Sequence, residues 1–230
     1  MVPCHSYNRV VLPAAVILDF DGVILDSETP EFESHRRVFE QCGATLTDEE
    51  WCVQIGTWSE GLGDRWHAAL CERSSQPLDR QTFERERRRI FEEIVPREPM
   101  RGIRELLQEL AGARVPCAIA SSGPARWVLP AIAGLGLTPL FGAIVTGNDV
   151  TRRKPAPDAY LEASQRLGVD PSRSIAIEDS AAGVAAARAA GLKTVAIPHW
   201  LTKTHDLSAA DLLAAHAGEL TLARLATLLA

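Results

Sequence analysis

Short runs of consecutive apolar residues recur along the chain, and each ends at a polar or glycine-rich turn. The runs cover residues 15–18, 115–120, 143–145, 175–177 and 194–197. Continuous apolarity is typical of strands that are buried on both faces of a sheet. Segments with helical spacing of apolar positions separate the runs, at residues 102–111, 124–133, 157–167 and 181–190. This alternation predicts an α/β fold built on a doubly wound parallel sheet.

The segment between the first two runs has a different pattern, because helical spacing continues there without a strand. Its predicted helices cover residues 30–41, 48–54, 60–72 and 80–93. Thr29, just before Pro30, is expected to cap the first helix, and Thr47 with Glu50 forms a capping box for the second. We therefore predict a four-helix cap domain at residues 28–95, inserted into a core of residues 10–27 and 96–230. Hinges are expected near Ser27 and residues 96–99.

The composition is that of a soluble globular protein, with 46% hydrophobic and 23% charged residues among 230 and a net charge of -6. No apolar run approaches the roughly 20 residues of a membrane-spanning helix, and no signal peptide is apparent. We therefore expect a cytoplasmic protein without a membrane partner, either a monomer or a weak homodimer. The arginine run at residues 85–89 is flanked by Glu84, Glu92 and Glu93, and at helical spacing these charges alternate in sign, which favours a solvated helix face over a nucleic-acid site.

Polar and charged residues follow the predicted strands at the edge where a doubly wound sheet binds ligands. Each of these polar segments, taken alone, is equally well explained as a common turn or helix cap. Together they form a coherent set, which is Asp19 and Asp21, then Ser121, Ser122 and Gly123, then Lys154, then Glu178 and Asp179.

These residue types suit a phosphate site that contains a metal ion. Asp19, Asp179 and Glu178, with a backbone carbonyl, supply the hard oxygen ligands that Mg²⁺ prefers. Lys154 is one of three lysines against 21 arginines, and it adds a point charge. Backbone N–H groups at a helix start beside Ser121 offer further anion donors. An acidic protein could thus hold an anion, because its carboxylates bind a dication and the dication binds phosphate.

Four motifs in this order resemble those of the haloacid dehalogenase (HAD) superfamily, in its phosphatase and β-phosphoglucomutase-like branch. They are Asp-Phe-Asp-Gly-Val at residues 19–23, Ser121, Lys-Pro-Ala-Pro-Asp at residues 154–158, and Ile-Glu-Asp-Ser-Ala-Ala-Gly at residues 177–183. The likeness covers nearly the whole chain from residue 10, including the inserted helices. It implies a Rossmann-like core and an enzyme that acts on phosphate esters, as a phosphatase or a phosphomutase.

The resemblance also implies a role for each motif residue. Asp19 matches the nucleophile that forms an aspartyl-phosphate, and Asp21 matches the general acid and base. Ser121, with Ser122 and Gly123 beside it, and Lys154 match the phosphate-binding positions. The magnesium site matches Asp19, the Asp21 carbonyl, Glu178 and Asp179.

The same resemblance separates neighbouring activities. Asp21 disfavours dehalogenation, since dehalogenases lack this aspartate, and the absence of lysine from residues 28–95 disfavours phosphonate cleavage. β-Phosphoglucomutase has a cap arginine where this chain has Ser59, and a threonine and a histidine where it has Ser27 and Glu31. We therefore expect hydrolysis of a small phosphate monoester, such as a sugar phosphate. The mutase is the alternative, and a catalytically idle binding protein is the third reading.

Aromatic residues of the cap divide into packing and candidate substrate positions. The spacing of Trp51 and Trp66 favours packing along one apolar stripe. Trp58 falls in a predicted loop that faces the core. Trp58 and Glu60 are expected to contact the leaving group, together with Ser27 and Glu31. After the last strand, His199 and Trp200 either line the edge of the site or anchor a loop.

Overall fold

A six-stranded parallel sheet forms the centre of the protein in the computed structural model, which describes residues 11–53, 55 and 62–230. The strand order is β3-β2-β1-β4-β5-β6. The strands are β1 Val16–Leu18, β2 Cys117–Ala120, β3 Ala143–Val145, β4 Ile175–Glu178, β5 Lys193–Ala196 and β6 Leu212–Leu213. All pairings are parallel, which confirms the predicted doubly wound α/β fold.

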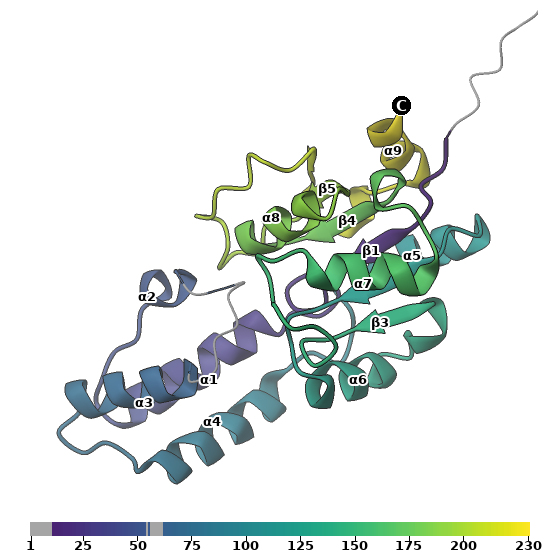
Figure 1. Cartoon of the computed structure of the whole chain (residues 1–230). Helices are drawn as coiled ribbons and strands as arrows, with labels where there is room; N and C mark the ends of the chain where they lie inside the picture. The colour runs from purple at the N-terminus through teal and green to yellow at the C-terminus, as the bar shows by residue number, and fades with distance from the viewer. Residues whose placement is uncertain (1–10, 54, 56–61) are drawn as a thin grey trace, which may run out of the picture.

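Helices cover both faces of the sheet (Figure 1). On one face lie α5 (Ile103–Gly112), α6 (Ala125–Gly134) and α9 (Leu222–Ala226), and on the other lie α7 (Asp158–Leu167) and α8 (Ala181–Ala189). Side chains alternate along each strand, so Val16 and Leu18 join the first layer while Ile17 joins the second. Because both faces are buried, the strands read as continuous apolar runs.

The segment between β1 and α5 is helical, and in Figure 1 its helices lie to one side of the sheet. It contains α1 (Glu28–Gln41), α2 (Asp48–Cys52), α3 (Leu62–Arg73) and α4 (Arg80–Ile94). Trp51 and Trp66 are buried there and stack with ring centroids 5.3 Å apart, which confirms their predicted packing role. These side chains belong to a hydrophobic cluster separate from the clusters on the sheet.

The helix starts confirm one predicted cap and correct another. Thr47 Oγ1 accepts the Glu50 N–H and the Glu50 carboxylate accepts the Thr47 N–H, which completes the capping box. The prediction that Thr29 caps the first helix was wrong, because α1 begins at Glu28 and includes Thr29. Asp26 Oδ1 accepts the Thr29 N–H instead, at 3.0 Å. An aspartate just before the helix takes the capping role that the prediction gave to threonine.

Two elements near the C-terminus were not predicted, namely β6 and α9. β6 has two residues and α9 has five, so neither is long enough to establish a hydrophobic period. The second inserted helix ends at Cys52, before the predicted end at residue 54, which lies outside the described residues. Among the helices that the structure describes, none is both long and apolar enough to cross a membrane.

Candidate active site

The predicted catalytic and metal-binding residues converge near the carboxyl ends of neighbouring strands. Asp19 directly follows β1, Glu178 ends β4 and Asp179 follows it. β1 and β4 are adjacent, and the strand order reverses between them, which is where doubly wound sheets bind ligands. Ser121 follows β2 on the other side of β1, and Lys154 comes from the loop between β3 and α7.

Lys154 joins the two acidic strand ends. Its Nζ donates to Asp19 Oδ1 at 2.6 Å and to Glu178 Oε1 at 2.5 Å, and all three residues are buried. The hydroxyl of Tyr160, on α7, also donates to Glu178 Oε1 at 2.5 Å. Burial by itself would lower the pKa of Lys154, but the charges of Asp19 and Glu178 raise it above its ordinary value. The ammonium therefore stays charged inside the protein.

The carboxylates in this cluster outnumber the described cations that hydrogen-bond to them. Oxygen atoms of Asp19, Glu178 and Asp179 lie within 4.8 Å of one another, and Lys154 pairs with two of the three. Asp179 Oδ2 is buried and has no hydrogen-bond partner among the described residues. Burial, then the neighbouring carboxylates, raise the pKa of Asp179 well above its usual range. Burial raises the pKa of Asp19 to about 7, although Lys154 opposes this.

This donor set fits a hard divalent cation. It consists of carboxylate oxygens, one of which is buried without a partner in the described part of the chain, and it carries surplus negative charge. Glycines keep the backbone close to these oxygens. A Cβ on Gly22 would lie 2.3 Å from Asp179 Oδ2, and a Cβ on Gly183 would lie 1.9 Å from Glu178 Oε2. Any side chain at either position would displace a carboxylate.

The loop after β2 presents hydrogen-bond donors beside this cluster. Ser121 is fully buried, and its Oγ accepts the Gly123 N–H at 2.9 Å. The Ser122 hydroxyl is buried and has no partner among the described residues. The Gly123 carbonyl accepts the Gly147 N–H at 2.8 Å, which ties the loop to the end of β3. Because α6 begins just beyond, at Ala125, the loop offers the donors that an anion needs.

Asp21 faces the same loop and accepts two strong hydrogen bonds. The Ser27 hydroxyl donates to Asp21 Oδ1 at 2.6 Å, and the indole Nε1–H of Trp127 donates to the same oxygen at 2.8 Å. Asp21 Oδ2 lies 3.4 Å from Ser121 Oγ. The expected contact of Ser27 with substrate stays a prediction, since its hydroxyl is engaged with Asp21 here.

Three polar residues at the site were not singled out from the sequence, namely Trp127, Tyr160 and Glu28. Trp127 contacts Asp21, 106 residues away in the sequence, and Tyr160 contacts Glu178, 18 residues away. The only sequence signal for either contact was a polar aromatic residue on a helix that follows a motif. Glu28 lies in the first turn of α1. Burial, then the charges of Asp21 and other nearby carboxylates, raise its pKa well above the usual range.

Glu31 has a partner within the inserted helices. Its carboxylate accepts two hydrogen bonds from Arg87 Nη1, at 2.8 and 2.9 Å, and so joins α1 to α4. The Arg87 side chain is 18% exposed, whereas Arg85 and Arg89 are 60% and 57% exposed. The arginine run is therefore solvated as predicted, except at Arg87. The expected substrate contact of Glu31 stays a prediction, and Trp58 and Glu60 lie outside the described residues.

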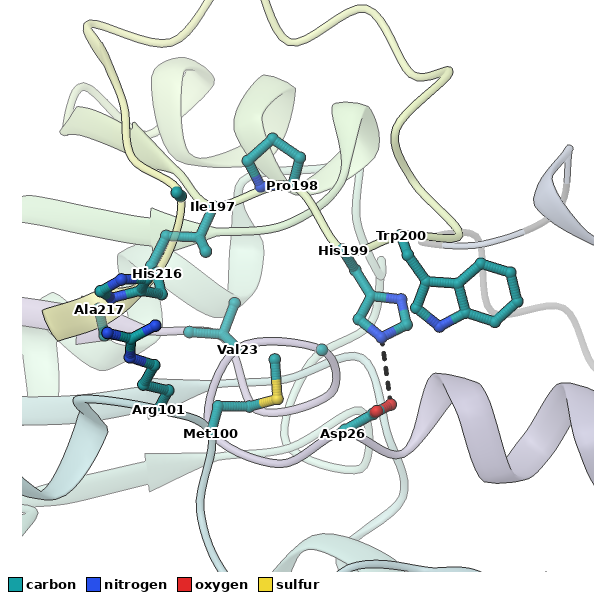
Figure 2. Close-up of a pocket in the computed structure, with 12 residues that line it drawn as sticks. Val23, Asp26, Met100, Arg101, Ile197, Pro198, His199, Trp200, His216 and Ala217 are labelled. Carbon is teal, nitrogen blue, oxygen red and sulfur yellow. Dashed lines mark ion pairs between the residues drawn. The ribbon is translucent and has the colours of Figure 1, made fainter. Parts of the chain in front are cut away.

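A cavity of about 240 Å³ lies beside the two connections between the sheet and the inserted helices (Figure 2). It is lined by Gly22, Val23, Asp26, Met100, Arg101, Ile197, Pro198, His199, Trp200, Ala215, His216 and Ala217. His199 points at Asp26 in Figure 2, and its Nε2 lies 3.2 Å from Asp26 Oδ1. Burial would raise the pKa of Asp26, but the hydrogen bonds from His199 and Thr29 lower it. His199 therefore anchors the loop, one of its two predicted roles.

Comparisons with known proteins agree with this geometry. The model of the haloacid dehalogenase-like hydrolase family matches residues 16–197. The chain is 35% identical to the phosphorylated carbohydrates phosphatase of Thermotoga maritima, over 79% of this chain and 83% of that protein. It is 31% identical to the fructose-1-phosphate phosphatase YqaB of Escherichia coli, over 79% of this chain and 95% of that protein.

A solved structure shows the same architecture. The crystal structure of CbbY from Rhodobacter sphaeroides in complex with phosphate superposes with a TM-score of 0.69, at 25% identity, over 91% of this chain and 96% of that chain. With a family match across both strand ends that carry the acidic cluster, and relatives that are phosphatases, the chain belongs to the haloacid dehalogenase-like hydrolases and is a phosphatase of that family.

Proposed function

We propose that this phosphatase hydrolyses a small phosphate monoester, such as a sugar phosphate, with Mg²⁺ and through a phosphoryl intermediate on Asp19. The observation that carries the proposal is the buried cluster in which Lys154 pairs with Asp19 and Glu178 while Asp179 Oδ2 has no partner among the described residues. The substrates in the names of the relatives, phosphorylated carbohydrates and fructose 1-phosphate, support the substrate class.

The reaction proceeds in two balanced steps. A carboxylate oxygen of Asp19 attacks phosphorus, and the bond from phosphorus to the leaving oxygen breaks as Asp21 donates its proton to that oxygen. Water then attacks phosphorus and gives a proton to Asp21, while the bond from phosphorus to Asp19 breaks and releases inorganic phosphate. Lys154, Ser121, Ser122 and the Gly123 backbone bind the phosphoryl oxygens throughout.

Asp19, Glu178, Asp179 and the Asp21 carbonyl are the groups that would hold the metal ion. When bound, Mg²⁺ supplies positive charge that stabilises the charge on the phosphoryl oxygens. Hydrolysis of phosphate monoesters is so slow without a catalyst that the site must lower the barrier by roughly 20 kcal/mol or more. Fixed charges and a covalent intermediate together can supply a reduction of that size.

Substrate recognition belongs to residues 28–95, which we propose act as a cap that opens and closes over the core of residues 10–27 and 96–230. In this proposal Ser27, Glu31, Trp58 and Glu60 face the leaving group when the cap closes. Ser27 and Glu31 stand where the resembling mutase has threonine and histidine, which favours water as the final phosphate acceptor.

Replacing the proposed nucleophile is the direct test of this function. Asp19→Asn should abolish phosphate release from a panel of sugar phosphates and leave the circular dichroism spectrum unchanged, because the amide is isosteric but poorly nucleophilic. Complete chelation of the wild-type protein should also abolish turnover, and added Mg²⁺ should restore it. Asp206→Asn is the matched control, because this carboxylate hydrogen-bonds locally to the Ser208 N–H in the loop between β5 and β6.

Three outcomes would contradict the proposal. Full activity of Asp19→Asn would exclude the covalent route, and undiminished activity after chelation would exclude the metal. Conversion of β-glucose 1-phosphate to glucose 6-phosphate, with a bisphosphate activator and no release of free phosphate, would identify the mutase instead.

A further inference from the structure

Trp127 lies on α6, two residues into the helix that follows the Ser121–Gly123 loop. Its indole Nε1–H donates to Asp21 Oδ1 at 2.8 Å. We propose that Trp127 is a positioning residue that holds the Asp21 carboxyl in the orientation needed for proton transfer. The inference rests on the proposed function, in which Asp21 is the general acid and base.

The hydrogen bonds distinguish the two oxygens of Asp21. Oδ1 accepts from both Ser27 and Trp127, at 2.6 and 2.8 Å, and two donors match the two lone pairs of a carboxylate oxygen. Oδ2 packs against Gly123, where a Cβ would lie 3.1 Å away, and it is 3.4 Å from Ser121 Oγ. Oδ2 is therefore the oxygen that faces a phosphoryl group held by the loop. Proton exchange with the leaving group or water occurs there.

The indole is the more rigid of the two donors. A serine hydroxyl rotates and can also accept a hydrogen bond, whereas an indole N–H only donates in a direction that the ring sets. The ring of Trp127 packs edge-on against Phe20 and Phe91, with centroids 6.2 and 5.3 Å away. Phe20 lies between the two catalytic aspartates in the sequence, and Phe91 lies on α4. The indole ring is therefore packed both by the core, through Phe20, and by the inserted helices, through Phe91.

The leaving group provides a test of this role. An alkoxide must be protonated as it leaves, while 4-nitrophenolate leaves readily without a proton. Trp127→Phe keeps a ring against Phe20 and Phe91 but removes the N–H. It should therefore lower kcat/KM for glycerol 2-phosphate by about ten-fold or more, and kcat/KM for 4-nitrophenyl phosphate by less than about two-fold. General damage to the fold would lower both values equally.

Trp200→Phe is the matched control. It removes an indole N–H that donates to Thr29 Oγ1 at 2.8 Å, away from Asp21, so the ratio of the two kcat/KM values should not change. An equal loss on both esters in Trp127→Phe, or an equal change of the ratio in Trp200→Phe, would overturn the inference. If the wild-type protein releases phosphate from neither ester and from no member of the sugar phosphate panel, the proposed function itself is wrong and the inference falls with it.

A double-mutant comparison and a spectroscopic measurement complete the test. In the Asp21→Asn background, Trp127→Phe should have no further effect on glycerol 2-phosphate, because the group that it positions no longer transfers a proton. A further ten-fold loss there would contradict the inference. Asp21→Asn should also shift one of the five indole N–H resonances, the one that is missing in Trp127→Phe. This measurement needs no catalytic activity, and an unchanged resonance would show that the hydrogen bond is absent in solution.

Discussion

Gly22 shows how a single residue sets the geometry of the acidic cluster. It has a φ of 77°, in the left-handed region that residues with a Cβ rarely adopt. A Cβ at this position would also lie 2.3 Å from the carboxylate oxygen Oδ2 of Asp179. The sequence motif Asp-x-Asp-Gly therefore combines the proposed nucleophile, the proposed acid and the one residue type that leaves room for a carboxylate from another strand.

Gly22→Ala should reduce activity beyond its effect on stability. The new Cβ must displace Asp179, so we expect at least a ten-fold higher Mg²⁺ requirement and at least a ten-fold lower kcat at fixed Mg²⁺, on the order of effects seen when metal sites are disturbed. Gly168→Ala is the matched control, because Gly168 also has a positive φ, of 67°, but a Cβ there meets nothing within 4 Å. Both variants should lose about 1 kcal/mol of unfolding free energy from backbone strain. Equal activity of the two variants would contradict this account.

The sequence located the charged residues of the candidate site but not their orientation. Asp19 and Asp179 could be placed because each lies next to a strand end, and parallel strand ends share one edge of the sheet. Lys154 could be placed because it lies in the loop that leads from β3 to α7 at the same edge. The contacts from Trp127 and Tyr160 could not be placed, since a helix period indicates which face is buried but not which distant atom a polar tip reaches. These contacts depend on how α6 and α7 pack on the sheet.

At the scale of elements, α1 links the candidate site to the interior of the inserted helices. Its first turn contains Glu28 and Glu31, and His35 lies one turn beyond Glu31. His35 is 2% exposed and its Nδ1–H donates to the Glu31 carbonyl at 2.8 Å. Its ring lies 4.8 Å from that of Trp51. Burial, and then the positive charge of Arg87, lower the pKa of His35 to about 3.

This buried histidine predicts a dependence of stability on pH. An unfolded histidine gains a proton near pH 6.5, whereas folded His35 gains one only near pH 3, so the unfolded state binds more protons between these values. The contribution of His35 to the free energy of unfolding should therefore fall as the pH falls below 6.5. The expected slope is about 1.4 kcal/mol per pH unit.

The measurement is urea unfolding of the wild-type protein and His35→Phe from pH 7 to pH 4.5. Other groups titrate in this range in both proteins, including the carboxylates of the site, so the difference between the two slopes isolates His35. The phenylalanine also removes the hydrogen bond to Glu31, which shifts the absolute stability but not the slope. Parallel slopes would show that His35 takes up its proton without unfolding.

The strands and helices themselves were largely predictable because the pattern is strong where both faces of a sheet are covered. The runs ending at Leu18, Ala120 and Val145 match β1, β2 and β3 at their carboxyl ends. The predictions of element ends failed where a capping pattern competed with another nearby hydrogen bond, and elements were missed where they were very short. The start of α1 is an example, since Asp26 rather than Thr29 caps it, and β6 is another.

At the scale of the whole molecule, the hydrophobic interior is divided. One cluster lies within α1–α4 and includes Phe39, Trp66 and Phe83, and separate clusters lie on the two faces of the sheet. Leu201, from the loop after β5, is the member of the first cluster that comes from outside the inserted segment. A segment with its own core can lose structure while the sheet remains folded. The predicted boundary between core and cap thus has a measurable consequence.

Phe83→Leu should loosen the inserted helices and leave the sheet intact. Phe83 is fully buried between α4 and the neighbouring helices, and the smaller side chain leaves a cavity that should cost roughly 1–2 kcal/mol. In hydrogen–deuterium exchange, peptides from α1, α3 and α4 should exchange faster than in the wild-type protein, while those from β1, β2 and β4 should be unchanged. Ile119→Val, in β2, is the matched control and should produce the reverse pattern. Faster exchange throughout the chain in Phe83→Leu would mean that both parts unfold as one cooperative unit, and the proposed division into a core and a cap would then have no energetic meaning.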